Sequence, residues 1–196
     1  ARVRFDTATV RLADVFAAVE KAGYHARDIA GEAPDADEVR EAVAKQDVEL
    51  VLQREQLGTA HAALQARAAL ADHDGPVLVM NGDHPLYRAR TLAALRETWE
   101  SRKAGLAILV TEMPDPTGYG RVIRDASGRV TRVVEQNDCS EAERGVREVN
   151  LGAYLADART LFELLARVGN QNAKSEFYIT DLVELAIASG RPVESY

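Results

Sequence analysis

Asp83, which follows an apolar run, is the first candidate functional residue of this chain. The stretch Val77–Leu86 reads VLVMNGDHPL, so four apolar residues lead into Asn-Gly-Asp. Such a run is typical of a strand buried on both faces of a parallel sheet, and ligands bind beyond the carboxyl ends of such strands. Asp83 is therefore a candidate ligand for Mg²⁺, which prefers one or two carboxylates together with phosphate oxygens. A turn acid, or an N-cap for the helix starting near Ala89, explains the same pattern.

A second candidate stretch carries two side-chain amides at the start of an expected helix. Residues 53–61 read QREQLGTAH, so a strand leads into Gln53, Gln56, Gly58 and Thr59. Unpaired backbone N–H groups and amides together match a flat ring with mixed donors and acceptors, such as a nucleobase. A capped strand-to-helix loop, with Thr59 as the cap, is the alternative.

Three more polar positions follow in the second half of the chain. Gly120 belongs to PTGYGR, where glycine-flanked backbone amides beside an arginine suit a sugar or phosphate oxygen. Glu135 ends a strand opposite this loop. Asn150 lies in the middle of an expected strand, where a buried amide needs a hydrogen-bond partner.

Alternating strands and helices are expected to position these residues. The apolar periodicity predicts strands over 48–53, 77–81 and 106–112 and helices over 59–71 and 89–102. This alternation predicts an α/β fold with a parallel sheet and right-handed crossovers. After Glu112 we expect a hairpin over 121–124 and 129–135, a polar and mobile excursion over 137–144, a strand over 146–155, helices over 160–168 and 180–189, and a strand that starts at Val193.

Composition narrows the function classes. The chain has 196 residues, 46% of them hydrophobic, which is enough for one globular domain or slightly more. Its formal charge of −7 argues against nucleic acid or an anionic membrane as the main partner. No apolar run approaches the roughly 20 residues that cross a bilayer, and the first residues lack a signal-peptide pattern. We therefore expect a cytoplasmic protein.

The cysteine count excludes thiolate metal sites, and the histidines show no metal-ligand pattern. Cys139 is the one cysteine, so neither an internal disulfide nor a site with several thiolates can form. The four histidines show no ligand spacing and are interpreted as structural or surface residues; they are His25, His61, His73 and His84.

The order of the polar motifs is more specific than any one motif. LQREQLGTAHA, VMNGDHPL, DPTGYGR, VVEQND, REVNLGAY and NQNAKSEFYITDLVELA follow one another along the chain. In this order they closely resemble the uridylyltransferase domain of the bifunctional bacterial N-acetylglucosamine-1-phosphate uridylyltransferase/glucosamine-1-phosphate acetyltransferase. The resemblance covers about residues 36–196.

The resemblance implies a Rossmann-like nucleotidyltransferase fold (GT-A-like), with a mostly parallel sheet flanked by helices and a small antiparallel hairpin part. It implies an enzyme that joins UTP with N-acetylglucosamine 1-phosphate, releases pyrophosphate with Mg²⁺, and supplies UDP-N-acetylglucosamine for cell-wall precursors. Carried over by motif, Asp83 would ligate Mg²⁺ as the catalytic residue. The uridine would be bound by Gln53, Gln56, Gly58 and Thr59, and the N-acetylglucosamine part by Gly120, Glu135 and Asn150.

The front of the chain departs from that family. The family's glycine-rich phosphate loop, LAAGxGTxM, is absent, and residues 1–35 instead resemble the second half of a heavy-metal-associated domain, a βαβ segment expected to pack onto the sheet. The family's second Mg²⁺ ligand would lie beyond Tyr196, and Leu151 stands where threonine is usual. The alternative function is therefore an impaired remnant that binds sugar nucleotides without turnover.

Overall fold

The computed structural model describes residues 2, 3, 44, 48–82, 84 and 86–196. Most helices and strands expected after residue 48 are present within a few residues of their predicted bounds. The segment 1–35, apart from residues 2 and 3, lies outside the described residues, as does Asp83. The elements in chain order are β1 (Arg2–Val3), β2 (Val48–Glu49), α3 (Thr59–Gln65), the 3₁₀ turn η1 (Ala68–Leu70), β3 (Pro76–Met80), α4 (Ala89–Ser101), β4 (Leu106–Glu112), β5 (Arg121–Arg124), β6 (Val130–Val134), α5 (Glu141–Arg144), β7 (Glu148–Asp157), α6 (Ala158–Leu165), the 3₁₀ turn η2 (Ile179–Asp181), α7 (Leu182–Ala188) and β8 (Val193–Ser195).

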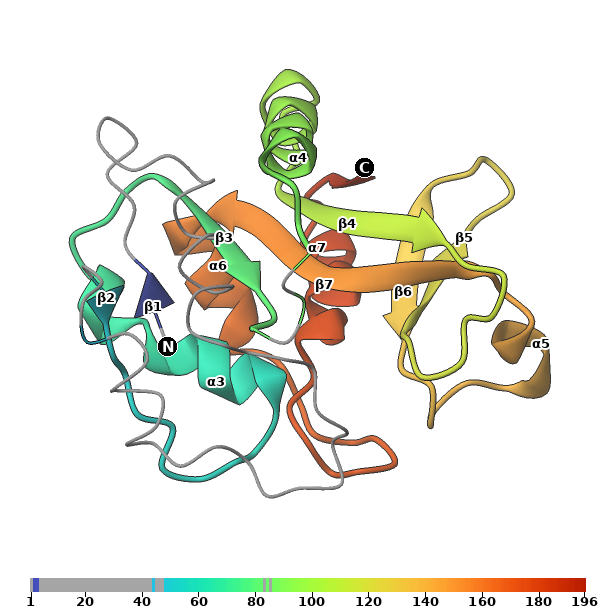
Figure 1. Cartoon of the computed structure of the whole chain (residues 1–196), viewed down its shortest axis with the longest axis horizontal. Helices are drawn as coiled ribbons and strands as arrows, with labels where there is room; N and C mark the ends of the chain where they lie inside the picture. The colour runs from blue at the N-terminus through green and yellow to red at the C-terminus, as the bar shows by residue number, and fades with distance from the viewer. Residues whose placement is uncertain (1, 4–43, 45–47, 83, 85) are drawn as a thin grey trace.

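Strand β7 is the centre of the main sheet, and Figure 1 shows it running between the β3 side and the β5–β6 hairpin. Along one edge β7 pairs with β4. Along the other edge it pairs with β5 at Val149 and with β3 from Ala153 to Asp157. On this edge, the β7 residues between Val149 and Ala153 therefore lie between the end of β3 and the start of β5.

The α/β class is confirmed, and the described sheet is mixed rather than mostly parallel. β3, β4 and β5 are each antiparallel to β7, so these three run in one direction. β8 is parallel to β4 and shares that direction. Strand β7 runs the other way because, like β6, it is antiparallel to β5, which lies between them. The connection from β6 to β7, which contains α5, therefore crosses over β5 to reach a strand of the same direction. The predicted hairpin is confirmed as the antiparallel pair β5–β6.

Helices cover both faces of the sheet. Leu106 and Ile108 of β4 pack with α6 and α7 in one core cluster, whereas Ala107 and Leu109 pack with α4 in the other. Successive side chains of a strand point to opposite faces, so a strand covered on both sides is apolar throughout. This explains why β4 shows no polar alternation over its first four residues.

The polar stretch 137–144, expected as a mobile excursion, contains a short helix. Ser140 caps α5 by accepting a hydrogen bond from the Glu143 N–H, while the Glu143 carboxylate accepts from the Ser140 N–H at 2.8 Å. The prediction was wrong because Ser-x-x-Glu is itself a helix-start signal. The Glu143 carboxylate also pairs with Arg132 of β6, which ties α5 to the hairpin.

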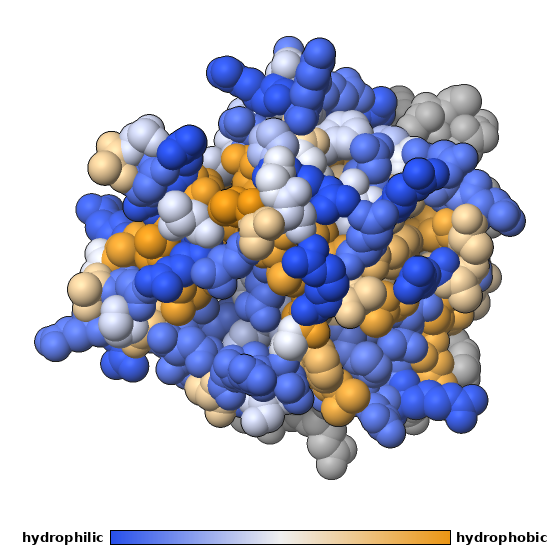
Figure 2. Space-filling view, turned by 180° about the vertical axis from the view of Figure 1, so that it is seen from behind, coloured by the Kyte–Doolittle hydropathy of each residue, from blue (hydrophilic) through white to orange (hydrophobic). Residues whose placement is uncertain are grey.

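At the front of the chain, Val3 pairs with Val48 in a separate two-stranded antiparallel sheet. The remaining residues of the 1–35 segment are not described, so its packing stays a prediction. Figure 2 shows the rear face, where hydrophobic areas alternate with hydrophilic side chains. Among the described helices, none combines the length and apolar character that crossing a bilayer requires.

Candidate functional site

The candidate site is centred on residues 150–152 of β7, between the end of β3 and the start of β5. Gly120 contributes its carbonyl oxygen, which accepts a hydrogen bond from the Asn150 N–H at 2.9 Å. From the opposite side, the Asn81 N–H donates to the Gly152 carbonyl at 3.2 Å. The polar loops that follow β3 and precede β5 are therefore anchored to neighbouring residues of one strand.

Gly152 allows this close approach. Its φ is +72°, a left-handed conformation that side chains with a Cβ rarely adopt, and a Cβ placed there would lie 2.3 Å from Asn81 Nδ2. A glycine in the middle of a strand signals close approach of another segment. Here that segment is the chain that carries Asn81 away from β3.

Asn150 is held by two hydrogen bonds of its own side chain. Its Nδ2 donates to the Tyr154 hydroxyl at 2.6 Å, and its Oδ1 accepts from the Gly152 N–H at 3.2 Å. The prediction that this amide needs a buried partner is confirmed. Burial raises the pKa of the fully buried Tyr154 phenol, and the nearby Glu135 charge adds to that shift. Sequence reasoning missed Tyr154, although residues four apart on a strand share a face.

Glu135 lies beside Gly120 and receives a hydrogen bond from Thr180. A Cβ placed on Gly120 would be 3.7 Å from both carboxylate oxygens of Glu135. Thr180 donates its hydroxyl to the Glu135 carboxylate at 3.2 Å. Burial raises the pKa of the Glu135 carboxyl, and the Thr180 hydrogen bond partly offsets that shift. The sequence predicted Thr180 only as the start of a helix. Its contact with Glu135, like that of Tyr154 with Asn150, was not predicted.

The loop 53–59 packs against the segment that precedes η2. The Thr59 hydroxyl accepts a hydrogen bond from the Ile179 N–H at 2.9 Å. Gly58 has a φ of +117°, and a Cβ there would lie 2.6 Å from the Phe177 carbonyl oxygen. Gln53 donates from Nε2 to the Gly58 carbonyl at 3.1 Å. The alternative in which Thr59 caps the helix is wrong, because Gly58 is the N-cap of α3 and Thr59 binds another segment.

Residues 177–180 join the two groups of predicted site residues. Ile179 binds Thr59, and the adjacent Thr180 binds Glu135. Five of the predicted residues are thus linked through short contacts: Gly58, Thr59, Gly120, Glu135 and Asn150. Gln53 supports this loop from within, and Gln56 is exposed on it.

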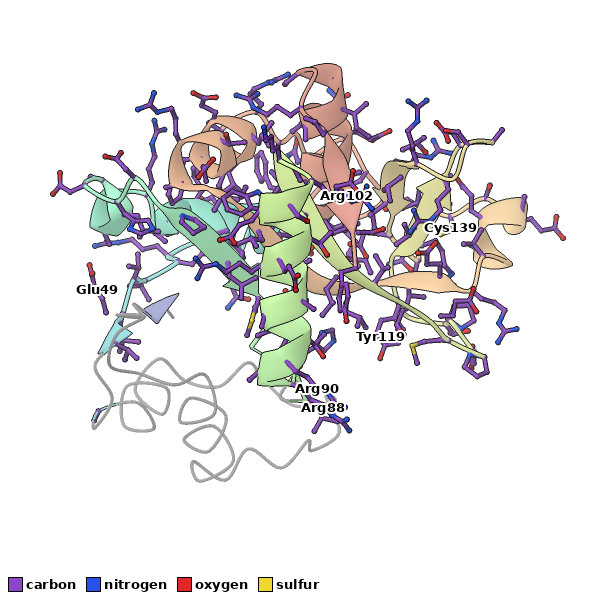
Figure 3. All side chains as sticks on the ribbon, turned by 90° about the horizontal axis from the view of Figure 1, so that it is seen from above. Glu49, Arg88, Arg90, Arg102, Tyr119 and Cys139 are labelled. Atoms are coloured by element: carbon purple, nitrogen blue, oxygen red, sulfur yellow. The ribbon has the colours of Figure 1, made fainter. Side chains whose placement is uncertain are left out.

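The chain on either side of position 83 is anchored to the same part of β7. Asn81 binds Gly152, as described above, and His84 Nδ1 lies 2.8 Å from the Leu151 carbonyl oxygen. The Tyr87 hydroxyl donates to that same oxygen. The His84 ring is 6.3 Å from the ring of Tyr119, which is labelled in Figure 3. His84 thus has a structural contact, as expected, and the described residues hold no cluster of three or more His, Cys, Asp or Glu side chains that could bind a metal ion.

Comparison with known proteins indicates one family for this chain. The model of the nucleotidyl transferase family matches residues 21–196. The chain is 50% identical over 139 residues to the "Bifunctional protein GlmU" of Anaeromyxobacter sp. (strain K) and 47% identical over 161 residues to that of Brevibacillus brevis, covering 71% and 82% of this chain. It spans only 28% and 35% of the length of these relatives.

Solved structures support the same fold. A UDP-glucose pyrophosphorylase complexed with UDP-glucose superposes with a TM-score of 0.58 at 17% identity, over 82% of this chain and 61% of that one. The apo form of a UDP-glucose pyrophosphorylase superposes with a TM-score of 0.60 over 81% of this chain and 59% of that one. At this level of identity the likeness supports the fold.

Proposed function

Because the chain belongs to the nucleotidyl transferase family, we propose that it carries the uridylyltransferase activity that makes UDP-N-acetylglucosamine from UTP and N-acetylglucosamine 1-phosphate. The ordered motifs and the identity to bifunctional GlmU proteins support this choice of substrates. The observation that carries the proposal is that Gly120 lies next to both Asn150 and Glu135, so that a backbone amide, a carboxylate and a carboxamide are close together.

The aminosugar fits the donors and acceptors of these three residues. Asn150 Nδ2 carries two hydrogens and donates one to Tyr154, so one is left, while the Gly152 N–H on Oδ1 fixes the orientation of the amide. Glu135 supplies a carboxylate that accepts sugar hydroxyl or amide hydrogens, and Gly120 supplies its N–H. Together they offer two donors and one acceptor group, a set that matches a ring with hydroxyl and acetamido substituents.

The uridine is proposed to lie against the loop 53–59. Gly58 and Thr59 hold this loop to residues 177–179, and Gln53 supports it through the Gly58 carbonyl and through His61 Nδ1 at 2.9 Å. The exposed Gln56 then presents a free amide to the uracil edge. A flat ring with alternating donors and acceptors is read by such an amide together with backbone groups.

The reaction needs no nucleophile from the protein. A phosphate oxygen of the sugar phosphate attacks the α-phosphorus of UTP, the bond from that phosphorus to the bridging oxygen breaks, and pyrophosphate leaves. The protein contributes by holding the two substrates in line. Mg²⁺, for which Asp83 is the proposed ligand, would neutralise charge on the phosphates. Asn81 and His84, anchored on β7, flank that position in the chain.

A pyrophosphate-release assay with UTP, N-acetylglucosamine 1-phosphate and Mg²⁺ tests the proposal. We expect release by the wild-type chain and a loss of at least about 100-fold in Asp83→Ala, since a removed group of this kind typically costs that much. Asp74→Ala, which changes an exposed acid, is the matched control and should keep full activity. Release that does not exceed the Asp83→Ala background would reject the activity.

The second candidate is a domain that binds sugar nucleotides without turnover, since residues 1–35 do not carry the glycine-rich phosphate loop. Isothermal titration calorimetry with UDP-N-acetylglucosamine separates the two. Binding without pyrophosphate release, weakened by Asn150→Ala, would support the second candidate. Absence of binding heat would exclude the second candidate.

A further inference from the structure

Arg121, the first residue of β5, is a buried cation whose hydrogen-bond partners among the described residues are neutral. Its side chain is 1% exposed, which makes it one of the most buried side chains of the described residues. Within that part of the chain, the ion pairs do not include Arg121, and its Nε has no hydrogen-bond partner. Burial of a guanidinium without a carboxylate is costly, so its position requires a physical explanation.

The guanidinium ties the loop before β5 to the residue after Glu135. Arg121 Nη2 donates to Gln136 Oε1 at 2.7 Å, and the same oxygen accepts the Gly118 N–H at 3.0 Å. Arg121 Nη1 donates to the carbonyl oxygen of Tyr119. The three contacts fix the loop residues 118–120 relative to Glu135.

The contact with Tyr119 determines where the Gly120 N–H points. The Tyr119 carbonyl and the Gly120 N–H belong to one planar trans peptide, so they point in opposite directions. The following peptide is fixed as well, because the Gly120 carbonyl accepts from the Asn150 N–H at 2.9 Å. Gly120 is buried, and no hydrogen bond of its N–H is found among the described residues. A buried N–H without a protein acceptor is rare, which indicates an acceptor supplied from outside the chain.

We propose that Arg121 is a positioning residue that orients and polarises the Gly120 N–H toward the aminosugar of the bound nucleotide sugar. This inference rests on the proposed function. The positive charge on the Tyr119 oxygen draws electron density from the amide and strengthens its N–H as a donor, because hydrogen bonds in a chain polarise one another. A neutral donor to the Tyr119 oxygen would hold the same direction with less polarisation, which explains why a charge is buried here.

Calorimetry with UDP-N-acetylglucosamine and with UDP measures this role, because only the first ligand carries the sugar. In Arg121→Met we expect the affinity for UDP-N-acetylglucosamine to fall about 10- to 100-fold, as for loss of a charge-assisted hydrogen bond. The affinity for UDP should stay within about twofold. Arg121→Lys, which restores a charged donor, should recover part of the loss. Arg129→Met removes an exposed arginine of the same hairpin and should change neither affinity.

A second variant keeps the inference testable if Arg121→Met does not fold. Gln136→Met removes the acceptor shared by Arg121 and Gly118 while leaving the guanidinium in place, and it should lower the sugar-dependent part of the affinity in the same direction. Equal weakening of both ligands, unchanged discrimination in Arg121→Met and Gln136→Met, or no recovery in Arg121→Lys would overturn the positioning role.

The wild-type chain separates this inference from the function it rests on. If the wild type binds UDP-N-acetylglucosamine more tightly than UDP and the variants keep the same ratio of affinities, only the role of Arg121 is contradicted. A wild-type chain that binds UDP-N-acetylglucosamine no more tightly than UDP contradicts the aminosugar site itself, and the role of Arg121 with it.

Discussion

Gly152→Ala tests the close contact between β3 and β7 on which the candidate site depends. Two costs arise at this position. An alanine at φ +72° is in the unfavourable left-handed region, whereas replacing glycine lowers the entropy of the unfolded chain. The balance of the two effects is a loss of about 1 kcal/mol. The new methyl group would also lie 2.3 Å from Asn81 Nδ2, and overpacking of this kind costs a further 1–3 kcal/mol or so. We expect Gly152→Ala to lower the free energy of unfolding by about 2–4 kcal/mol.

Gly190→Ala is the matched control for the backbone cost. Gly190 has a φ of +71°, almost the same as that of Gly152, and a Cβ placed there has no atom within 4 Å. This variant should lose about 1 kcal/mol only. For a chain of this size, 1 kcal/mol corresponds to about 2–4 °C in the melting temperature, so the two variants are readily distinguished by thermal or urea unfolding.

Asn81→Ala separates the clash from every other effect of the methyl group. If the cost of Gly152→Ala comes from contact with the Asn81 side chain, the double variant is less destabilised than the sum of the singles by about 1–3 kcal/mol. Equal losses in Gly152→Ala and Gly190→Ala, or singles that add within about 0.5 kcal/mol, would refute the reasoning.

Three other predictions concern the residues around η2. Gly58→Ala places a methyl group 2.6 Å from the Phe177 carbonyl oxygen, a backbone atom that cannot rotate out of the way as a side chain can. We expect calorimetry to show UTP affinity at least tenfold lower in Gly58→Ala and unchanged in Gly190→Ala. Burial, together with the nearby carboxylates of Glu184 and Glu135, raises the pKa of Asp181 from 3.8 to about 6. The folded chain therefore binds this proton more tightly than the unfolded chain does, and its stability falls as the pH rises from about 4 through 6. Asp181→Asn should therefore be more stable than wild type at pH 7 by about 1 kcal/mol, allowing for partial exposure, and the two unfolding curves should coincide below about pH 4; a gain that persists at pH 3 contradicts this cause. Thr180→Val removes the hydrogen bond that lowers the pKa of Glu135, so UDP-N-acetylglucosamine binding should require a higher pH than in wild type, and an unshifted pH profile would argue against that contact.

Local patterns were sufficient for the individual strands and helices after residue 48. The expected strand over 106–112 is β4, and the expected helix over 89–102 ends one residue earlier as α4. These segments were predictable because their apolar periodicity reflects burial on one or both faces, which is a local property of the chain. The same reasoning named Gly120, Glu135 and Asn150, which the structure brings together, and the ordered motifs indicated the family to which the chain belongs.

The partners of these residues depend on which strands lie side by side. Strand β7 lies between β3 and β4, and periodicity along the chain does not encode this placement. The placement makes the sheet mixed and brings Asn81 against Gly152. The contacts of Thr180 with Glu135 and of Thr59 with Ile179 join residues 45 and 120 positions apart. Apolar periodicity and residue type thus account for which segments form strands and helices and for which side chains have chemical use. Which of those side chains meet depends on strand order and on loops that pack across the sheet, and neither is a local property of the chain.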